Sequence, residues 1–185
     1  WPPSITSMSR VCAAGTHLFA AFGKMVYGFM QIGDRVQHVV SIGPYPDECR
    51  LVVEGPNTCI ALAHGKALHI VDPKAPGASK ACCLTAHHET ISALQCNVGR
   101  GILLTSGRDS AITLWSYLES VLDRIVTVPE AHHDWILQLK LDYFLGVVLS
   151  TGMDGQVRVW SVEGSALTCM TQETEAKSDG ILQLQ

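Results

Sequence analysis

The sequence predicts an all-β protein built from a repeated unit. Helical periodicity is hard to find, whereas short alternating or continuous runs of β-forming residues recur between turn residues. Part of the chain also repeats itself with an offset of 45 residues. Of the 185 residues, 47% are hydrophobic and 16% are charged, which is typical of a folded domain and not of a disordered segment.

The expected strands are short and lie between segments rich in turn-forming residues. They cover residues 51–53, 67–71, 101–104, 112–115, 147–149 and 157–160. Two longer surface loops are also expected. The first is residues 41–54, where Pro44, Pro46 and Pro56 cluster, and the second is residues 75–79.

The repeat is clearest between residues 86–116 and residues 131–161. The offset of 45 residues places the Ala-His-His of 86–88 on the Ala-His-His of 131–133. It also places Asp109 on Asp154 and Trp115 on Trp160. The spacing is the same at every matched position, so these two segments are copies of one structural unit.

Weaker copies extend the repeat in both directions. Residues 134–139 recur as 179–184. Upstream, Phe29 and Val71 align with Trp115 and Trp160 at the ends of equivalent strands, and the four residues are spaced 42, 44 and 45 residues apart. A period of roughly 40 to 45 residues with four short strands is typical of a β-propeller blade, which buries its faces only against neighbouring blades. We therefore expect a β-propeller of four-stranded antiparallel blades, with about four blades plus the start of a fifth from a ring of about seven or eight. The expected blades cover residues 4–33, 34–80, 81–126 and 127–175, with the start of the next at 179–185.

The third and fourth units resemble the WD-repeat family. In that family a His before the first strand, a Ser or Thr in the second, an Asp in the turn before the third and a Trp in the third form a hydrogen-bonded chain. The resemblance implies such a network in each unit, made of His87, Thr105, Asp109 and Trp115 and of His132, Ser150, Asp154 and Trp160. The first two units lack the His, Asp and Trp, and Ser116 and Ser161 replace the Asp that follows the family's Trp.

Each network would satisfy four polar groups inside a blade. A buried indole N–H needs an acceptor, a hydroxyl can accept from it and donate to imidazole, and a carboxylate can hold the imidazole tautomer. The same residue types occur in Ser-His-Asp catalytic sites, but a quartet that appears twice with one period indicates a structural role. We therefore expect no enzyme activity, no catalytic residues and no cofactor.

Charge and cysteine content limit the remaining classes of function. The net charge is −4 and the 13 basic residues are scattered, which argues against nucleic acid as the partner. Seven cysteines without disulfide-like spacing indicate a reducing intracellular compartment, either cytoplasm or nucleus, and no segment suggests membrane insertion. Zinc-binding residue types occur at Cys82, Cys83, His87, His88, His132 and His133, but without the spacing of a zinc site, so no metal is expected.

A partner-binding rim is expected where the loops before first strands and the turns between second and third strands converge, because this is the family's usual binding face. The candidate residues are Trp135, Arg108, Met153, Asp134 and Glu89. Trp135 stands where the neighbouring units have Thr90 and Gly180, so the blade itself does not require an aromatic residue there. Packing of Trp135 over the loop of an adjacent blade is an equally weighted alternative. On the opposite rim, Tyr143 and Phe144 are expected to pack locally.

The expected function is that of a protein–protein interaction scaffold, a propeller subunit or domain of a multiprotein intracellular complex. One alternative is the propeller of a ribonucleoprotein or ribosome-assembly factor that contacts RNA, although Arg100, Arg108, Lys140 and Arg158 are widely spaced. Another alternative is a regulatory WD-repeat domain of a larger enzyme or motor. Fold analogy carries most of this inference.

Overall fold

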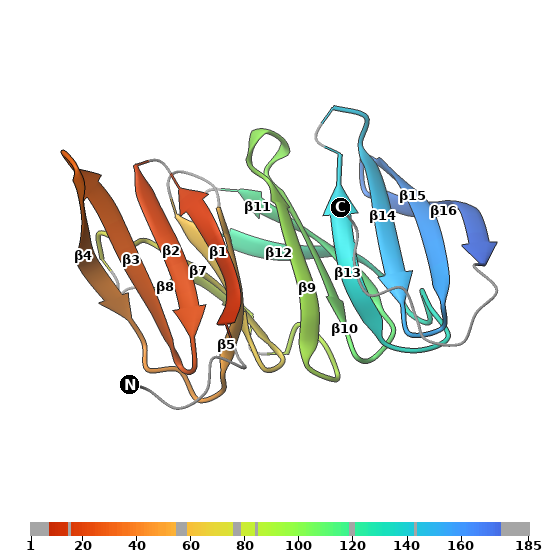
Figure 1. Ribbon diagram of the computed structural model, residues 1–185. Coiled ribbons are helices and arrows are strands. Elements are labelled where there is room, and N and C mark those ends of the chain that lie inside the picture. Colours follow the sequence, from red (N-terminus) through yellow and green to blue (C-terminus); the bar gives the residue numbers. More distant parts are fainter. Residues whose placement is uncertain are drawn as a thin grey trace.

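The computed structural model describes residues 8–14, 16–54, 59–75, 79–83, 85–118, 121–142 and 144–174. They form four antiparallel sheets of four strands each, which stand side by side in a row (Figure 1). Within every sheet the strands follow the order of the chain, so each sheet is a simple meander. The predicted all-β fold of four-stranded antiparallel blades is confirmed. The expected start of a fifth blade, at 179–185, lies outside the described residues.

The strands are five to nine residues long and are joined mainly by short turns. The first sheet contains β1 (Met8–Ala14), β2 (His17–Phe22), β3 (Met25–Ile32) and β4 (Arg35–Ile42), and the second contains β5 (Cys49–Glu54), β6 (Ile60–His64), β7 (Ala67–Val71) and β8 (Ser79–Cys83). The third contains β9 (Ile91–Asn97), β10 (Ile102–Gly107), β11 (Ile112–Leu118) and β12 (Val121–Val128), with a short 3₁₀ helix (Val98–Arg100) between β9 and β10. The fourth contains β13 (Ile136–Leu141), β14 (Val147–Gly152), β15 (Gln156–Glu163) and β16 (Ala166–Thr174). In the described part of the chain, no helix is long and apolar enough to cross a membrane.

The boundaries of the first two blades differ from those expected. The boundary between 33 and 34 falls in the turn between β3 and β4, yet β4 pairs with β3 from Val26–Ile42 to Ile32–Arg35 and completes the first sheet. Likewise, β8 extends past residue 80 and pairs with β7. The ends of these blades could not be predicted from the sequence, because the fourth strand of a blade carries no marker residue and β4 is mostly exposed along its length.

The expected loop at 41–54 is also shorter than predicted. Residues 43–48 connect the first two sheets, whereas 49–54 form β5, whose Val52 pairs with Leu62 of β6. Pro44 and Pro46 both lie in the connection, where a missing backbone N–H interrupts no ladder. The prolines therefore indicate the loop correctly, but the loop ends where β5 begins at Cys49.

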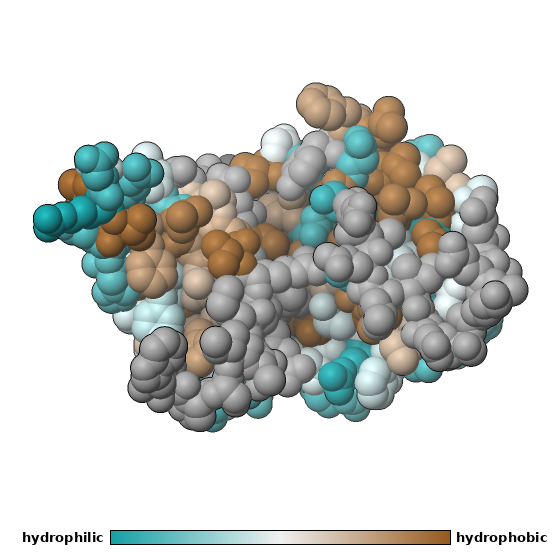
Figure 2. All heavy atoms as spheres, viewed as in Figure 1, coloured by the Kyte–Doolittle hydropathy of each residue, from teal (hydrophilic) through white to brown (hydrophobic). Residues whose placement is uncertain are grey.

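The outer face of the first sheet has no neighbouring sheet among the described residues. Several of its apolar side chains are exposed, including Val11 at 54% and Leu18 at 48%. Figure 2 shows brown apolar residues over part of this end of the molecule, interspersed with teal hydrophilic ones. An exposed apolar sheet face of this kind is unusual on a folded monomer.

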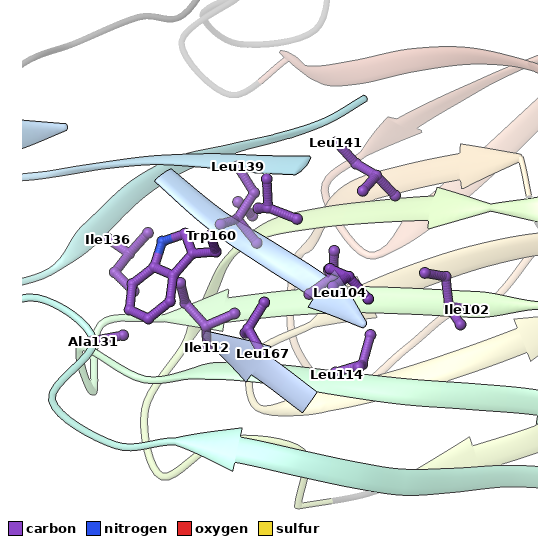
Figure 3. Packing of buried hydrophobic residues seen from close by; sticks show 13 residues of the cluster. Ile102, Leu104, Ile112, Leu114, Ala131, Ile136, Leu139, Leu141, Trp160 and Leu167 are labelled. Atoms are coloured by element: carbon purple, nitrogen blue, oxygen red, sulfur yellow. The ribbon is translucent and has the colours of Figure 1, made fainter. Parts of the chain in front are cut away.

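Three apolar clusters hold the row together, one in each space between adjacent sheets. The cluster between the third and fourth sheets contains Leu104 and Ile112 from one side and Leu139 and Trp160 from the other (Figure 3). Alternate residues of a strand point to opposite faces, so each inner sheet contributes to two clusters. The core is therefore a series of thin layers and not one central mass.

Candidate functional site

The third blade contains a continuous chain of hydrogen bonds that runs from its tryptophan to an aspartate. The Trp115 indole N–H donates to Thr105 Oγ1 at 2.8 Å, and Thr105 Oγ1 lies 2.8 Å from His87 Nε2. His87 Nδ1 lies 3.0 Å from both carboxylate oxygens of Asp109. Because indole can only donate and a carboxylate only accepts, the indole N–H donates to Thr105, and His87 donates through Nδ1–H to Asp109. When the imidazole is neutral, its Nε2 accepts from the Thr105 hydroxyl.

The fourth blade repeats this chain with Ser in place of Thr. The Trp160 indole N–H donates to Ser150 Oγ at 2.9 Å, and Ser150 Oγ lies 2.7 Å from His132 Nε2. His132 Nδ1 lies 2.9 and 3.1 Å from the two carboxylate oxygens of Asp154. The structure thus brings together all eight residues that the repeat singled out, as two separate quartets.

The aspartates also anchor the backbone of the loop beside them. Asp109 accepts from the backbone N–H of His88 at 2.8 Å, and Asp154 accepts from that of His133 at 2.9 Å. Burial raises the pKa of each carboxyl group, but the bonds from histidine and from backbone N–H groups outweigh this effect and hold the pKa below its usual value. Burial lowers the pKa of His132, against the opposing effect of Asp154. In the fourth blade these shifts favour an uncharged His132 beside an ionised Asp154.

The quartets leave no free ring nitrogen for chemistry. Both nitrogens of His87 and of His132 have hydrogen-bond partners, and the hydroxyl groups of Thr105 and Ser150 are buried. Each quartet joins the loop before the first strand to the turn between the second and third strands. Their structural effect is to hold two rim segments of a blade against each other.

The rim above these quartets carries an aromatic contact between two blades. The Arg108 guanidinium, in the β10–β11 turn of the third blade, lies 4.5 Å from the ring centroid of Trp135, just before β13 of the fourth. Trp135 nevertheless remains 45% exposed. The ring of Trp135 therefore contacts the loop of an adjacent blade and still presents a face to solvent, while its part in partner binding stays a prediction.

The other rim candidates lie around this contact. Met153 is 42% exposed, and its backbone N–H donates to the carbonyl of Trp135 at 2.8 Å. Asp134 accepts from the backbone N–H of Trp135 at 2.7 Å. Glu89 lies farther along the rim, where its carboxylate is 3.8 Å from the Lys66 ammonium group in an exposed pair.

The opposite rim differs from expectation at Phe144. This side chain is 92% exposed and its neighbour Leu145 is 76% exposed, so Phe144 does not pack locally. Asp142 accepts from the backbone N–H groups of both residues, at 2.9 and 2.7 Å, and holds a tight turn that points them outward. Tyr143 lies outside the described residues.

The second blade has a polar cluster that sequence reasoning missed. Nε2 of His64 lies 2.8 Å from Nε2 of His69, and the Tyr45 ring stacks on His64 with centroids 4.8 Å apart. Asp47 lies 4.0 Å from Nδ1 of His64. Burial, and then the nearby His64, lowers the pKa of His69 to about 4. The two histidines are five residues apart on either side of the hairpin turn at Gly65. A tight turn there places both side chains on one face of the hairpin, which is the sequence signal for this pair.

The zinc-capable residues whose side chains are described do not converge. Within the described ranges, no three His, Cys, Asp or Glu side chains are grouped to hold a metal ion. His88 and His133 are exposed neighbours of the quartet histidines. Nothing is described of the side chains of Cys82 and Cys83, which lie on β8.

Comparison with known proteins supports the fold. No family model and no curated protein sequence matches the chain. Among solved structures, the chain is similar to Chaetomium thermophilum Sqt1 bound to the N-terminus of the ribosomal protein L10, with a TM-score of 0.81 and 19% sequence identity over 95% of this chain. The chain spans about half of that structure, 52% of its length. This likeness and the four-stranded antiparallel sheets show a β-propeller architecture and fit a WD-repeat fold.

Proposed function

We propose that this chain of propeller blades is a protein-interaction scaffold within an intracellular multiprotein complex, in the cytoplasm or the nucleus, and is not an enzyme. The observation that carries the proposal is the exposed pair of Arg108 and Trp135 on the rim. Tryptophan and arginine are the residues most enriched among the energetic anchors of protein interfaces. Here the cation holds the ring in place before any partner arrives, which lowers the entropy cost of binding.

The surroundings of the pair suit a protein surface. Met153 adds a flexible apolar side chain, while Asp134 and Glu89 add carboxylates at the margin. An apolar centre with a polar edge is the common arrangement of protein interfaces. Two buried quartets beneath the rim keep its loops in one conformation, so the patch is preorganised.

A protein is favoured over RNA as the partner. In the similar structure named above, the ligand of Sqt1 is a segment of a protein. The basic residues considered for RNA are also dispersed: Arg158 is 8% exposed and donates to the backbone of Ala131, and Arg100 lies at the opposite end of β10 from Arg108. They offer no continuous basic stripe for a phosphate backbone.

A structural role for the quartets supports the non-enzymatic assignment. A catalytic triad needs a hydroxyl that can reach a substrate, whereas Thr105 and Ser150 are both 0% exposed and already accept from indole. The same arrangement also occurs in two neighbouring blades. Such repetition is expected of a structural network and not of a single active site.

Affinity capture with quantitative mass spectrometry tests the rim. The double variant Trp135→Ala with Arg108→Glu is compared with the parent chain and with Phe144→Ser, which changes an exposed aromatic residue on the opposite rim. We expect the double variant to lose a defined subset of partners while Phe144→Ser retains them. Circular dichroism and urea unfolding establish that all three proteins are folded. Equal capture by all three places the partner surface elsewhere.

A further inference from the structure

An open cavity of about 490 Å³ lies between the β6–β7 turn of the second blade and strands β11 and β12 of the third. Its lining includes two side chains that are always charged and three with hydroxyl groups, which are Lys66, Arg124, Thr85, Thr113 and Thr127. A cavity of this volume is large enough for a small ligand or for one side chain of a partner.

In the fourth blade an arginine fills the equivalent place. Arg158 stands 45 residues after Thr113, and its guanidinium donates to the carbonyl of Ala131 and lies 4.0 Å from Asp154. The residues 45 positions before these two contacts both line the cavity of the third blade. The short side chain of Thr113 therefore opens a space that the same architecture fills in the next blade.

The charge of the lining also differs between the two blades. The third blade has two cations and one carboxylate, which are Lys66, Arg124 and Asp109. The equivalent positions of the fourth blade supply one cation and two carboxylates, which are Arg158, Glu130 and Asp154. Because both sets occupy the same places in one architecture, the difference comes from the side chains themselves. It favours an anion in the cavity of the third blade.

The carboxylate of the third blade is already engaged. The Asp109 side chain is 9% exposed, and its oxygens accept from Nδ1 of His87 and from the backbone N–H groups of His88 and Ala111. These N–H groups compensate its charge where it stands. The cations of the lining are more accessible, because the Lys66 side chain is 51% exposed and Arg124 is also exposed.

The donors of the cavity are held in position. The Arg124 guanidinium donates to the carbonyl of Thr85 at 2.9 Å and lies 5.0 Å from the ring centroid of Trp115. Its planar fork of N–H groups matches the oxygen atoms of a phosphate. The hydroxyl oxygens of Thr113 and Thr127 are 3.1 Å apart. Only one of these hydroxyl groups donates in that bond, so the other can donate its proton to a ligand.

We propose that this cavity binds the phosphate group of a phosphate monoester, with Arg124 and Lys66 as its cationic contacts and the pair of Thr113 and Thr127 as a hydroxyl donor. The phosphate can belong to a phosphorylated serine of a protein or to a small molecule, since both present the same charged oxygen atoms. The rim pair of Arg108 and Trp135 does not line the cavity, so the inference does not rest on the proposed function.

Isothermal titration calorimetry with the full chain tests the ligand class. The probes are inorganic phosphate and the tripeptide acetyl-Ala-phosphoserine-Ala-amide, compared with the same tripeptide carrying serine or glutamate. We expect saturable binding of both phosphate probes at a single site, competition between them, and no binding of the serine peptide. Tighter binding of the phosphopeptide assigns the site to a phosphorylated protein, and tighter binding of inorganic phosphate assigns it to a small molecule. Failure of both phosphate probes to saturate, or equal binding of the glutamate peptide, would overturn the proposal.

Substitutions test the location of the site. Lys66→Gln and Arg124→Gln should each weaken phosphate binding by at least about tenfold, since each removes a charged contact. The matched controls are Lys74→Gln and Arg35→Gln, which change exposed cations outside the cavity and should bind as the parent chain does. Unchanged affinity in both cavity variants contradicts the assignment.

A further variant copies the fourth blade. Ala111→Gln with Thr113→Arg introduces the side chains of Gln156 and Arg158 at the equivalent positions, so it should fill the cavity and abolish phosphate binding. Circular dichroism establishes that this variant is folded. If it does not fold, the exposed substitutions at Lys66 and Arg124 still decide the question. A folded double variant that binds phosphate as tightly as the parent chain would place the site elsewhere and overturn the proposal.

Discussion

The indole N–H of Trp160 donates to Ser150 Oγ over 2.9 Å, and both residues are almost completely buried. Ser150 in turn donates to His132. Replacing Ser150 by Ala leaves the indole N–H and one imidazole nitrogen without a partner in a dry interior. Each unsatisfied group costs about 1–3 kcal/mol, so Ser150→Ala should lower the free energy of unfolding by roughly 2–4 kcal/mol. Urea unfolding followed by circular dichroism measures this loss.

The adjacent hydroxyl provides the control. Thr151 is 0% exposed, and its Oγ1 has no hydrogen-bond partner among the described residues. Thr151→Val replaces this hydroxyl by a methyl group of the same shape, so it should leave stability unchanged or raise it. If the Thr151 and Ser150 variants lose equal stability, the loss reflects packing and not the hydrogen-bonded chain.

Gly152 should tolerate no side chain. A Cβ at this position would lie 2.5 Å from Nδ1 of His132 and 2.6 Å from a carboxylate oxygen of Asp154. Gly152→Ala should therefore push the two groups apart and destabilise the blade by about 1–3 kcal/mol, as overpacking commonly does. At Gly99 the nearest atom to a new Cβ is 3.6 Å away, so Gly99→Ala is the matched control. Thermal unfolding should separate the two variants clearly.

Stability should fall as the pH drops from neutrality towards 4. The pKa of His69 is lowered to about 4 by burial and then by the nearby His64. The unfolded chain therefore binds a proton near pH 6.5 while the folded chain does not, so its stabilising contribution is complete above pH 6.5 and is lost progressively as the pH falls towards 4. His64 and His132 act in the same direction, because burial lowers the pKa of each. The urea midpoint measured between pH 7.5 and 4.5 should show this decline.

His69→Gln tests the origin of the decline. Glutamine keeps a polar group beside His64 but does not titrate, so the slope between pH 6.5 and 4 should become shallower. The aspartates of the quartets act at lower pH, because their pKa values are lower in the folded chain than in the unfolded chain. The ionised carboxylates stabilise the fold above the usual carboxyl pKa, and this contribution is lost as the pH falls through the folded pKa. An unchanged slope in His69→Gln would assign the dependence above pH 4 to other groups.

The contact between Arg108 and Trp135 should add little to stability. Cation–π pairs at exposed sites are worth about 0.5–1 kcal/mol. A double-mutant cycle with Arg108→Ala and Trp135→Ala should give a coupling energy within that range, measured by urea unfolding. A coupling well above it would mean that the pair is structural, and loss of partners in the rim variants would then reflect a distorted rim.

Much of the two C-terminal blades could be predicted from the repeat. The resemblance to the WD-repeat family implied that Asp109 and Asp154 bind their histidines, and the fixed offset showed that both copies carry the same residue types. The first two blades lack these markers, so β4 was assigned to the wrong sheet. The pair His64 and His69 has no counterpart in the other copies, and only the pairing of β6 with β7 brings it together.

By itself, the sequence determined the all-β repeat, because periodic spacing places equivalent residues at equivalent points of each blade. Its resemblance to the WD-repeat family implied the members of both quartets. Only the tertiary structure decided which strands complete each sheet, that Arg108 covers Trp135, and that Phe144 points outward. These depend on contacts between blades and on the curvature of turns, where residues distant in the chain meet. The physical reason is that a blade's internal pairing is local in sequence, whereas what covers its faces depends on its neighbours.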